Sequence, residues 1–216
     1  MRGAVLEVEE WEALRGRGRE RRWDAGRAIF REGDPSTWVI GIRDGRVKLT
    51  VVSPEGRDVV LAVKAPGELL GEFAALDGRP RSATAVALER VEGVIVDAGA
   101  FSAFLEEHPA VSALVLRQLT GQLRRVAHDW VDRDGVEVVV RVARRLVDLA
   151  ERFGEHNGTT VVIRIGITQD DLAGWVGATR EATNRALGVL RRERCLQTGR
   201  QHLVITDLER LAELAS

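Results

Sequence analysis

The sequence has 216 residues, a formal net charge of −1, 44% apolar residues and 30% charged residues, which is ordinary for a soluble globular protein. This length accommodates one large domain or two small ones, and the near-zero charge excludes a globally basic nucleic-acid-binding protein. The single cysteine, Cys195, excludes an internal disulfide and an all-cysteine iron–sulfur site, and the 4 histidines lack metal-ligand spacing. No segment has a signal-peptide core or the ~20 apolar residues that span a bilayer, so we expect a cytoplasmic protein without a metal.

Short β-prone segments fill the first half of the chain. A short amphipathic helix over Glu7–Leu14 precedes them, and from Ala28 to about Val96 they are separated by turn signals such as Gly33-Asp34-Pro35. Many short strands at close spacing predict an antiparallel sandwich or roll. Asp44-Gly45, between two strand-like segments, predicts a hairpin turn.

The apolar period changes after residue 108. Apolar residues then recur at alternating spacings of three and four, which defines a heptad seam: Leu116, Leu119, Leu123, Val126 and Trp130. Such a short seam packs either on its own domain or on a second chain. Because Val111, Leu114 and Val115 supply a separate face toward the roll, we favour a helix that dimerises.

A small helical domain with a hairpin is predicted at the C-terminal end. The segment DRDG at 132–135 is the expected hinge, followed by a helix over VVVRVARRLVDLAERFG and a strand over TTVVIRI. Two helices come next, then two β segments, RRERCLQTG and RQHLVITD, around Gly199. Asp207 is placed to cap a last helix through Leu214. Helices followed by a small hairpin are typical of a winged helix.

The two helices of this domain carry clear start and stop signals. Thr168 followed by Asp171 fits a capping box for the first helix, Gly177 ends it, and Thr179 caps a second helix that starts at Arg180. A helix, a tight glycine turn and a second helix form the helix-turn-helix layout.

One exposed face of the second helix collects polar side chains that suit base edges. Arg180, Glu181, Asn184 and Arg185 lie in its first turn and a half, where a recognition helix meets the major groove. Six arginines and two acidic residues lie between Thr179 and Arg200, a local net charge of +4. Such a face is often merely solvated, but the capped turn and the following hairpin favour DNA binding.

The segment TREATNRAL resembles the recognition helix of the Crp-Fnr superfamily of bacterial transcription regulators. The segment GEFAALDGRPRSA at 71–83 is similar to the phosphate-binding cassette of their cyclic-nucleotide-binding domains. The resemblance covers essentially the whole chain and implies an α+β fold with an N-terminal antiparallel β-roll, a long dimerisation helix and a C-terminal winged helix-turn-helix. The implied domains are a β-roll effector domain at 1–108, a dimerisation helix with its hinge at 109–136, and a DNA-binding domain at 137–216.

The resemblance also implies roles for the cassette residues. Gly71, Ser82 and Ala83 match donors around a cyclic phosphate, Arg81 matches the arginine that pairs with its charge, and Glu72 matches the carboxylate that bonds the ribose 2′-hydroxyl. These roles agree with chemistry, since a buried phosphate requires charge-assisted donors. The expected effector is cAMP.

On the DNA side, the resemblance assigns base reading to Arg180, Glu181 and Arg185, and backbone-phosphate contacts to Thr168 and Gln169. Seven residues form the expected DNA-binding set: Thr168, Gln169, Thr179, Arg180, Glu181, Asn184 and Arg185. The implied partners are a second copy of the chain, a palindromic operator in double-stranded DNA with TGTGA-type half-sites, and RNA polymerase.

One departure leaves the effector open. In family members that respond to cAMP, polar residues of the dimer helix often reach the adenine, but Val126 and Ala127 stand here where the best-known sensor has hydroxyl residues. Arg125, His128 or Asp129 are the available substitutes.

Several alternatives therefore stay open. The main one is a regulator of this family that binds DNA without a nucleotide or senses another effector. A haem sensor has no support in the sequence, since a lone histidine is more often structural or solvated. A regulatory module of an enzyme or channel does not account for the arginines of the second helix. An enzyme is disfavoured because Ser82, Cys195 and the histidines show no arrangement of a nucleophile with a base.

Overall fold

The structure is a computed structural model that describes residues 5–54, 56–199 and 202–216, except for the side chains of Arg125 and of residues 128–134. The chain forms two compact units. Of the described residues, the first unit holds 5–54, Gly56 and Val60–Leu123, and the second holds Arg57–Val59 and those after Leu123.

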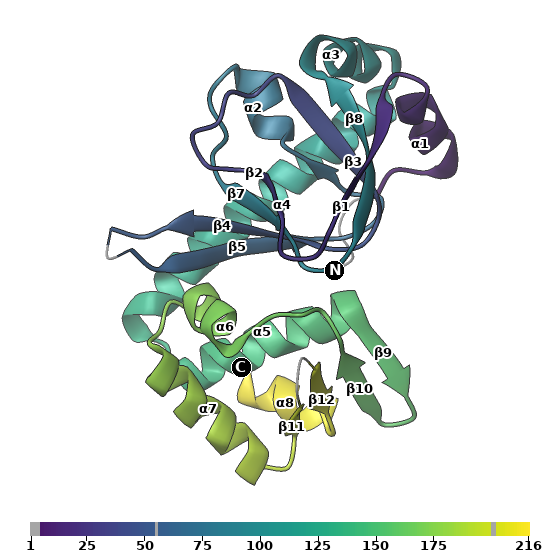
Figure 1. The fold of residues 1–216 in the computed structure, drawn as a ribbon. Coiled ribbons are helices and arrows are strands. Elements are labelled where there is room, and N and C mark those ends of the chain that lie inside the picture. Colours follow the sequence, from purple (N-terminus) through teal and green to yellow (C-terminus); the bar gives the residue numbers. More distant parts are fainter. Residues whose placement is uncertain (1–4, 55, 200–201) are drawn as a thin grey trace. The chain divides into compact units, whose positions relative to one another are not determined.

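Two four-stranded sheets build the first unit (Figure 1). The first sheet has, in spatial order, β1 (Arg19–Trp23), β8 (Val91–Asp97), β3 (Trp38–Asp44) and β6 (Leu69–Leu70). The second has β2 (Ala28–Phe30), β7 (Thr84–Ala87), β4 (Val47–Val52) and β5 (Asp58–Lys64). β8 pairs antiparallel with β1 and β3, and β7 pairs antiparallel with β2 and β4, which confirms the antiparallel roll.

The first sheet is buried on both faces. In β3, Ile40 and Ile42 point into the core shared with the second sheet, whereas Val39 points to a cluster on the opposite face. In β8, Ile95 and Val94 divide in the same way. Since successive side chains of a strand point to opposite faces, this double burial explains why β3 and β8 read as continuous apolar segments.

Helices cover the outer face of this sheet. They are α1 (Val8–Arg15), α3 (Ala98–Glu107) and the first part of α4 (Pro109–Gly135). Leu14 of α1, Phe101 and Phe104 of α3, and Val111 and Val115 of α4 share one buried cluster with the sheet. The expectation that α4 turns a separate face toward the roll is therefore confirmed.

The heptad seam of α4 lies largely outside this cluster. Leu116, Leu123 and Val126 are 61%, 71% and 56% exposed, whereas Leu119 packs partly against the roll. The side chain of Trp130 lies outside the described residues. The seam thus leaves a row of exposed apolar side chains along the helix.

The second unit contains four helices after α4 and one sheet. The helices are α5 (Val138–Phe153), α6 (Gln169–Val176), α7 (Arg180–Arg192) and α8 (Leu208–Leu214). The sheet has, in spatial order, β11 (Leu196–Gly199), β12 (His202–Ile205), β10 (Thr160–Ile163) and β9 (Gly154–Asn157). Leu146, Leu149, Leu187 and Leu190 are fully buried and form its centre. Asp207 accepts the backbone N–H of Arg210 at 2.9 Å and so caps α8, as expected.

Three local predictions were wrong. Asp44-Gly45 is a turn, with Gly45 at φ 80°, but it joins β3 and β4, which lie in different sheets, so it is not a hairpin. The segment RRERCLQTG begins as the end of α7, since Arg191 and Arg192 are still helical, and only Leu196–Gly199 forms a strand. The segment DRDG lies within α4, and the helix break follows it.

The buried thiol of Cys195 makes the packing of the second unit measurable. Its thiol is buried and donates to the carbonyl of Leu190 at 3.2 Å, and burial raises the pKa of the Cys195 thiol. We expect thiol reagents to label native protein at least about a hundredfold more slowly than denatured protein, since only the thiolate reacts and the fold disfavours it.

The same shift gives a pH dependence. A raised thiol pKa stabilises the fold below the ordinary pKa of about 8.5, and this stabilisation is lost as the pH rises above it. Between pH 7 and pH 10, the free energy of unfolding should therefore fall more for wild type than for Cys195→Ala. Equal losses, or rapid labelling of the native protein, would show that the thiol is accessible.

Candidate functional site

A pocket in the roll collects the cassette residues. Its lining comprises Phe30, Leu49, Leu61, Lys64, Leu70, Gly71, Glu72, Phe73, Ala74, Arg81, Ser82, Ala83 and Gln122. Most of these side chains are apolar, and the pocket encloses about 430 Å³ including its open mouth.

All five residues expected to bind a cyclic nucleotide line this one pocket. They are Gly71, Glu72, Arg81, Ser82 and Ala83. Ser82 is exposed at the mouth, whereas Glu72, Arg81 and Ala83 are buried. The fold therefore brings the cassette together, from the start of α2 (Glu72–Asp77) to the segment before β7.

Gly71 is required by the conformation of the loop. It has φ 83°, in the left-handed region, and a Cβ at this position would collide with the guanidinium of Arg81. A residue with a side chain would be strained here and would also push Arg81 away.

The guanidinium of Arg81 is held by backbone carbonyls and aromatic rings. Nη1 donates to the carbonyl of Gly71 at 2.9 Å and Nη2 to the carbonyl of Trp38 at 2.6 Å. Cζ lies 4.3 Å from the ring centroids of both Phe30 and Trp38, and the residue is only 2% exposed. Burial lowers the pKa of Arg81, while the negative charges of Glu72 and Asp34 oppose this shift.

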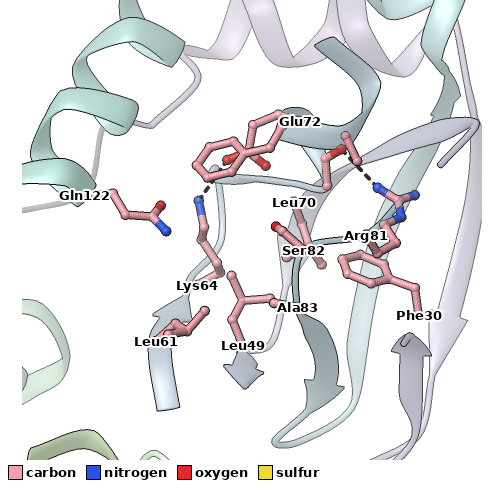
Figure 2. A pocket seen from close by; sticks show the side chains of 13 residues that line it. Phe30, Leu49, Leu61, Lys64, Leu70, Glu72, Arg81, Ser82, Ala83 and Gln122 are labelled. Carbon is pink, nitrogen blue, oxygen red and sulfur yellow. Dashed lines mark hydrogen bonds and ion pairs between the residues drawn. The ribbon is translucent and has the colours of Figure 1, made fainter. Parts of the chain in front are cut away.

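Glu72 faces a lysine that sequence reasoning did not single out. The Nζ atom of Lys64 lies 3.4 Å from Oε1 of Glu72, and both side chains are almost fully buried (Figure 2). Lys64 ends β5, and its only sequence signal is a charge at the end of the apolar segment VVLAVK in a chain with two lysines.

One polar residue of α4 also reaches the pocket. The amide of Gln122 points into it from the helix side (Figure 2). The side chains of Arg125, His128 and Asp129, the expected substitutes for the missing hydroxyl residues, lie outside the described residues. Gln122 was missed because its position on the pocket side of the helix depends on how α4 packs.

In the second unit, the helix-turn-helix has the predicted caps. Thr168 accepts the backbone N–H of Asp171 at 3.1 Å, and Asp171 in turn accepts the backbone N–H of Thr168 at 3.0 Å. Gly177 ends α6 with φ 63°, and Thr179 accepts the backbone N–H of Ala182 at 3.2 Å at the start of α7. The capping box, the glycine end and the second cap are all confirmed.

The start of α7 presents the expected polar face. Arg180, Glu181 and Arg185 are exposed, and Asn184 is half-buried beside them. Arg180 lies 3.4 Å from Asp170 across the turn, an ion pair that is itself exposed. The pKa of Glu181 is lowered by hydrogen bonds from its own backbone N–H and from the Thr179 hydroxyl. The positive charges of Arg180 and Arg185 lower it further. The Glu181 side chain is therefore a hydrogen-bond acceptor at neutral pH.

The remaining members of the expected DNA-binding set lie at the two helix starts. Thr168, Gln169 and Thr179 are exposed there. The α6–α7 pair is held together by apolar side chains, all buried: Leu172, Ala173, Val176, Ala186, Leu187 and Leu190.

Comparison with known proteins identifies a domain family for each of the two units. Residues 20–108 match the cyclic nucleotide-binding domain family, and residues 140–214 match the Crp-like helix-turn-helix domain family. The CRP-like cAMP-activated global transcriptional regulator of Mycobacterium tuberculosis is 33% identical over 190 residues, which are 88% of this chain and 85% of that protein. The chain belongs to the CRP-like family of transcription regulators.

Solved structures confirm the fold of this CRP-like regulator. A CRP-family transcriptional regulator from Thermus thermophilus is 25% identical with a TM-score of 0.75, covering 90% of this chain and 96% of that one. The c-di-GMP responsive global regulator of Xanthomonas campestris is 20% identical with a TM-score of 0.78, covering 92% and 98%. The α+β architecture of β-roll, long helix and winged helix-turn-helix is thereby confirmed.

Within the described part of the chain, no helix is long and apolar enough to cross a membrane. The same residues contain no cluster of three or more histidine, cysteine, aspartate or glutamate side chains that could hold a metal ion.

The caps at the two helix starts yield a stability prediction. Thr168→Ala and Thr179→Ala should each lower the free energy of unfolding by about 1 kcal/mol, because each leaves a backbone N–H at a helix start without its acceptor. Chemical denaturation measures the change. Thr168→Ser keeps the hydroxyl and should behave like wild type, whereas alanine variants as stable as wild type would refute the caps.

Proposed function

We propose that cAMP, bound in the roll pocket, controls the DNA affinity of this CRP-like regulator, which acts as a homodimer on a palindromic operator. The observation that carries the proposal is the convergence of Gly71, Glu72, Arg81, Ser82 and Ala83 on one pocket. The cAMP-activated relative from Mycobacterium tuberculosis supports the choice of nucleotide.

In the proposed complex, the cyclic phosphate lies at the cassette. Arg81 supplies positive charge, and Ser82 with the backbone N–H groups of Gly71 and Ala83 supplies further donors. Glu72 accepts the ribose 2′-hydroxyl. The charge-assisted donors offset the cost of removing the phosphate from water, which is large in an apolar pocket.

The homodimer is proposed to form along α4. The exposed side chains of Leu116, Leu123 and Val126 follow one seam of the helix, and a second copy of the same helix would bury them. In this scheme residues 1–108 bind the effector, 109–136 dimerise and 137–216 bind DNA. The nucleotide controls DNA binding if it binds the DNA-competent state more tightly than the other state.

The DNA contacts are proposed to follow the two helix starts. Arg180, Glu181, Asn184 and Arg185 read base edges in the major groove, while Thr168, Gln169 and Thr179 contact backbone phosphates. A dimer reads two half-sites about one helical turn apart, here TGTGA-type elements. We also propose RNA polymerase as a partner, a cytoplasmic location and no enzymatic activity.

A second candidate is a regulator that binds DNA without a nucleotide. Two observations favour it. Nη1 and Nη2 of Arg81 already donate to the carbonyls of Gly71 and Trp38, although its Nε has no hydrogen-bond partner among the described residues, and Glu72 is already paired with Lys64. These contacts stabilise the charged groups of the pocket without a ligand, and nucleotide titration separates the two candidates.

Calorimetry with cAMP tests the effector. Wild type should bind cAMP more tightly than cGMP, and Arg81→Ala should lower the affinity for cAMP at least tenfold, because the phosphate loses its principal cation. Arg79→Ala, an exposed change in the same loop, should bind like wild type. Because Arg81 is buried, thermal unfolding accompanies the titration, and Ser82→Ala at the exposed mouth provides a second variant with a smaller loss. Wild type that binds no cyclic nucleotide would favour the second candidate.

DNA binding tests the recognition helix. Arg180→Ala and Arg185→Ala should each cost about 1–3 kcal/mol on a TGTGA-type palindrome and relax discrimination against a scrambled site. Arg43→Ala, an exposed arginine on β3, serves as the control and should retain wild-type affinity. Fluorescence anisotropy at fixed salt gives the affinities. Equal binding of wild type to the palindrome and the scrambled site would contradict the assignment.

A further inference from the structure

We propose that Lys64 is a specificity-determining residue of the roll pocket, whose ammonium binds the effector's phosphate and makes the pocket selective for a monoanionic cyclic phosphodiester. The inference deepens the proposed function and rests on it. It assigns a phosphate ligand outside the cassette, on β5.

The residues that line the pocket carry a net positive charge. Three of its lining residues are charged: Lys64, Glu72 and Arg81. Two cations and one anion leave a net charge of +1, and the other lining residues are uncharged. Asp34, which also acts on Arg81, is not part of the lining. A ligand with one negative charge therefore makes the filled pocket neutral, which is the arrangement that low-dielectric surroundings favour.

The two cations of the pocket, Arg81 and Lys64, differ in how firmly their present partners hold them. Both terminal nitrogens of Arg81 donate to backbone carbonyls, and Cζ lies 4.3 Å from the ring centroids of Phe30 and Trp38, although Nε has no hydrogen-bond partner in the part of the chain that the structure describes. Lys64 is held by an ion pair of 3.4 Å, long for a charge-assisted hydrogen bond. Its flexible four-carbon stem and three donors let the ammonium turn toward a new anion at small cost. Lys64 is thus the cation that is readier to meet an entering phosphate.

Movement of the Lys64 ammonium toward the phosphate also changes what Glu72 can bind. While Lys64 pairs with it, the carboxylate is engaged at one oxygen. When the ammonium moves to the phosphate, Glu72 becomes free to accept the ribose 2′-hydroxyl. One exchange of partners therefore prepares both halves of the ligand site, and no charge in the pocket is left without a partner.

The pocket should consequently discriminate by ligand charge. Adenosine, which is neutral, would leave the pocket at +1, and 5′-AMP as a dianion would take it to −1. Both should bind more weakly than cAMP. Replacing Lys64 by methionine removes the positive charge while keeping a side chain of similar length, so cAMP should then lose much of its advantage over adenosine.

Calorimetry on a matched set of variants tests this. Lys64→Met should weaken cAMP binding at least tenfold, whereas Lys48→Met, which changes the only other lysine of the chain, should not. A purely structural role for Lys64, that of neutralising Glu72, is tested in the Glu72→Gln background. There Lys64→Met should still weaken cAMP binding, because the phosphate contact does not depend on Glu72. The neutral double variant also guards against misfolding, since it leaves no unpaired buried charge.

The outcomes separate the two proposals. If wild type binds cAMP but Lys64→Met binds as tightly or more tightly, or if its effect vanishes in the Glu72→Gln background, the role of Lys64 is overturned while the proposed effector stands. If wild type binds none of cAMP, cGMP and 5′-AMP, both are overturned.

Lysine-selective isotope labelling gives an independent readout. Because the chain has two lysines, the side-chain spectrum contains two signals, and Lys48→Met assigns them. Saturating cAMP should shift the Lys64 signal and leave the Lys48 signal in place. A Lys64 signal that stays unchanged while calorimetry reports bound cAMP would overturn the contact.

Discussion

The buried guanidinium of Arg81 connects the two sheets of the roll with the start of the cassette. Arg81 contacts the rings of Phe30 in the second sheet and Trp38 in the first, and it donates to the carbonyls of Trp38 and Gly71. Cation–π contacts and charge-assisted hydrogen bonds to carbonyls stabilise a cation that is removed from water. This single side chain therefore links both sheets to the start of the cassette, and any anion that recruits it alters all three.

Contacts within the roll stabilise the charged groups of the pocket without removing its net positive charge. Glu72 and Lys64 neutralise one another, and two backbone carbonyls hold Nη1 and Nη2 of Arg81, while its Nε has no hydrogen-bond partner within the described chain. A ligand gains affinity only where its own contacts exceed those that it replaces. Under the proposed function, ligand identity therefore depends on the exchange of partners at Lys64, Glu72 and Arg81 as well as on the shape of the pocket.

Sequence reasoning succeeded where structure is local. The caps at Thr168 and Thr179 and the glycine end at Gly177 depend on neighbouring residues, and all three were predicted at the correct positions. It failed where distant segments meet. Asp44-Gly45 had the residues of a hairpin, but the two strands that it joins pair elsewhere. Lys64 and the aromatic stack around Arg81 were missed because they depend on contacts between separate strands and the cassette, which no local pattern encodes.

The two functional surfaces differ in how much they must change on binding. The ion pair between Arg180 and Asp170 is exposed, and such pairs contribute about 0–1 kcal/mol, so the recognition face can meet DNA at little cost. In the proposed complex, in contrast, the pocket exchanges the buried partners of Lys64 and Arg81 to accept a phosphate. In the proposed mechanism, ligand-dependent differences in free energy arise in the roll, where buried partners must be exchanged. Under that proposal, control originates in the buried charges of the roll, and the polar face of α7 determines which DNA sequence is read.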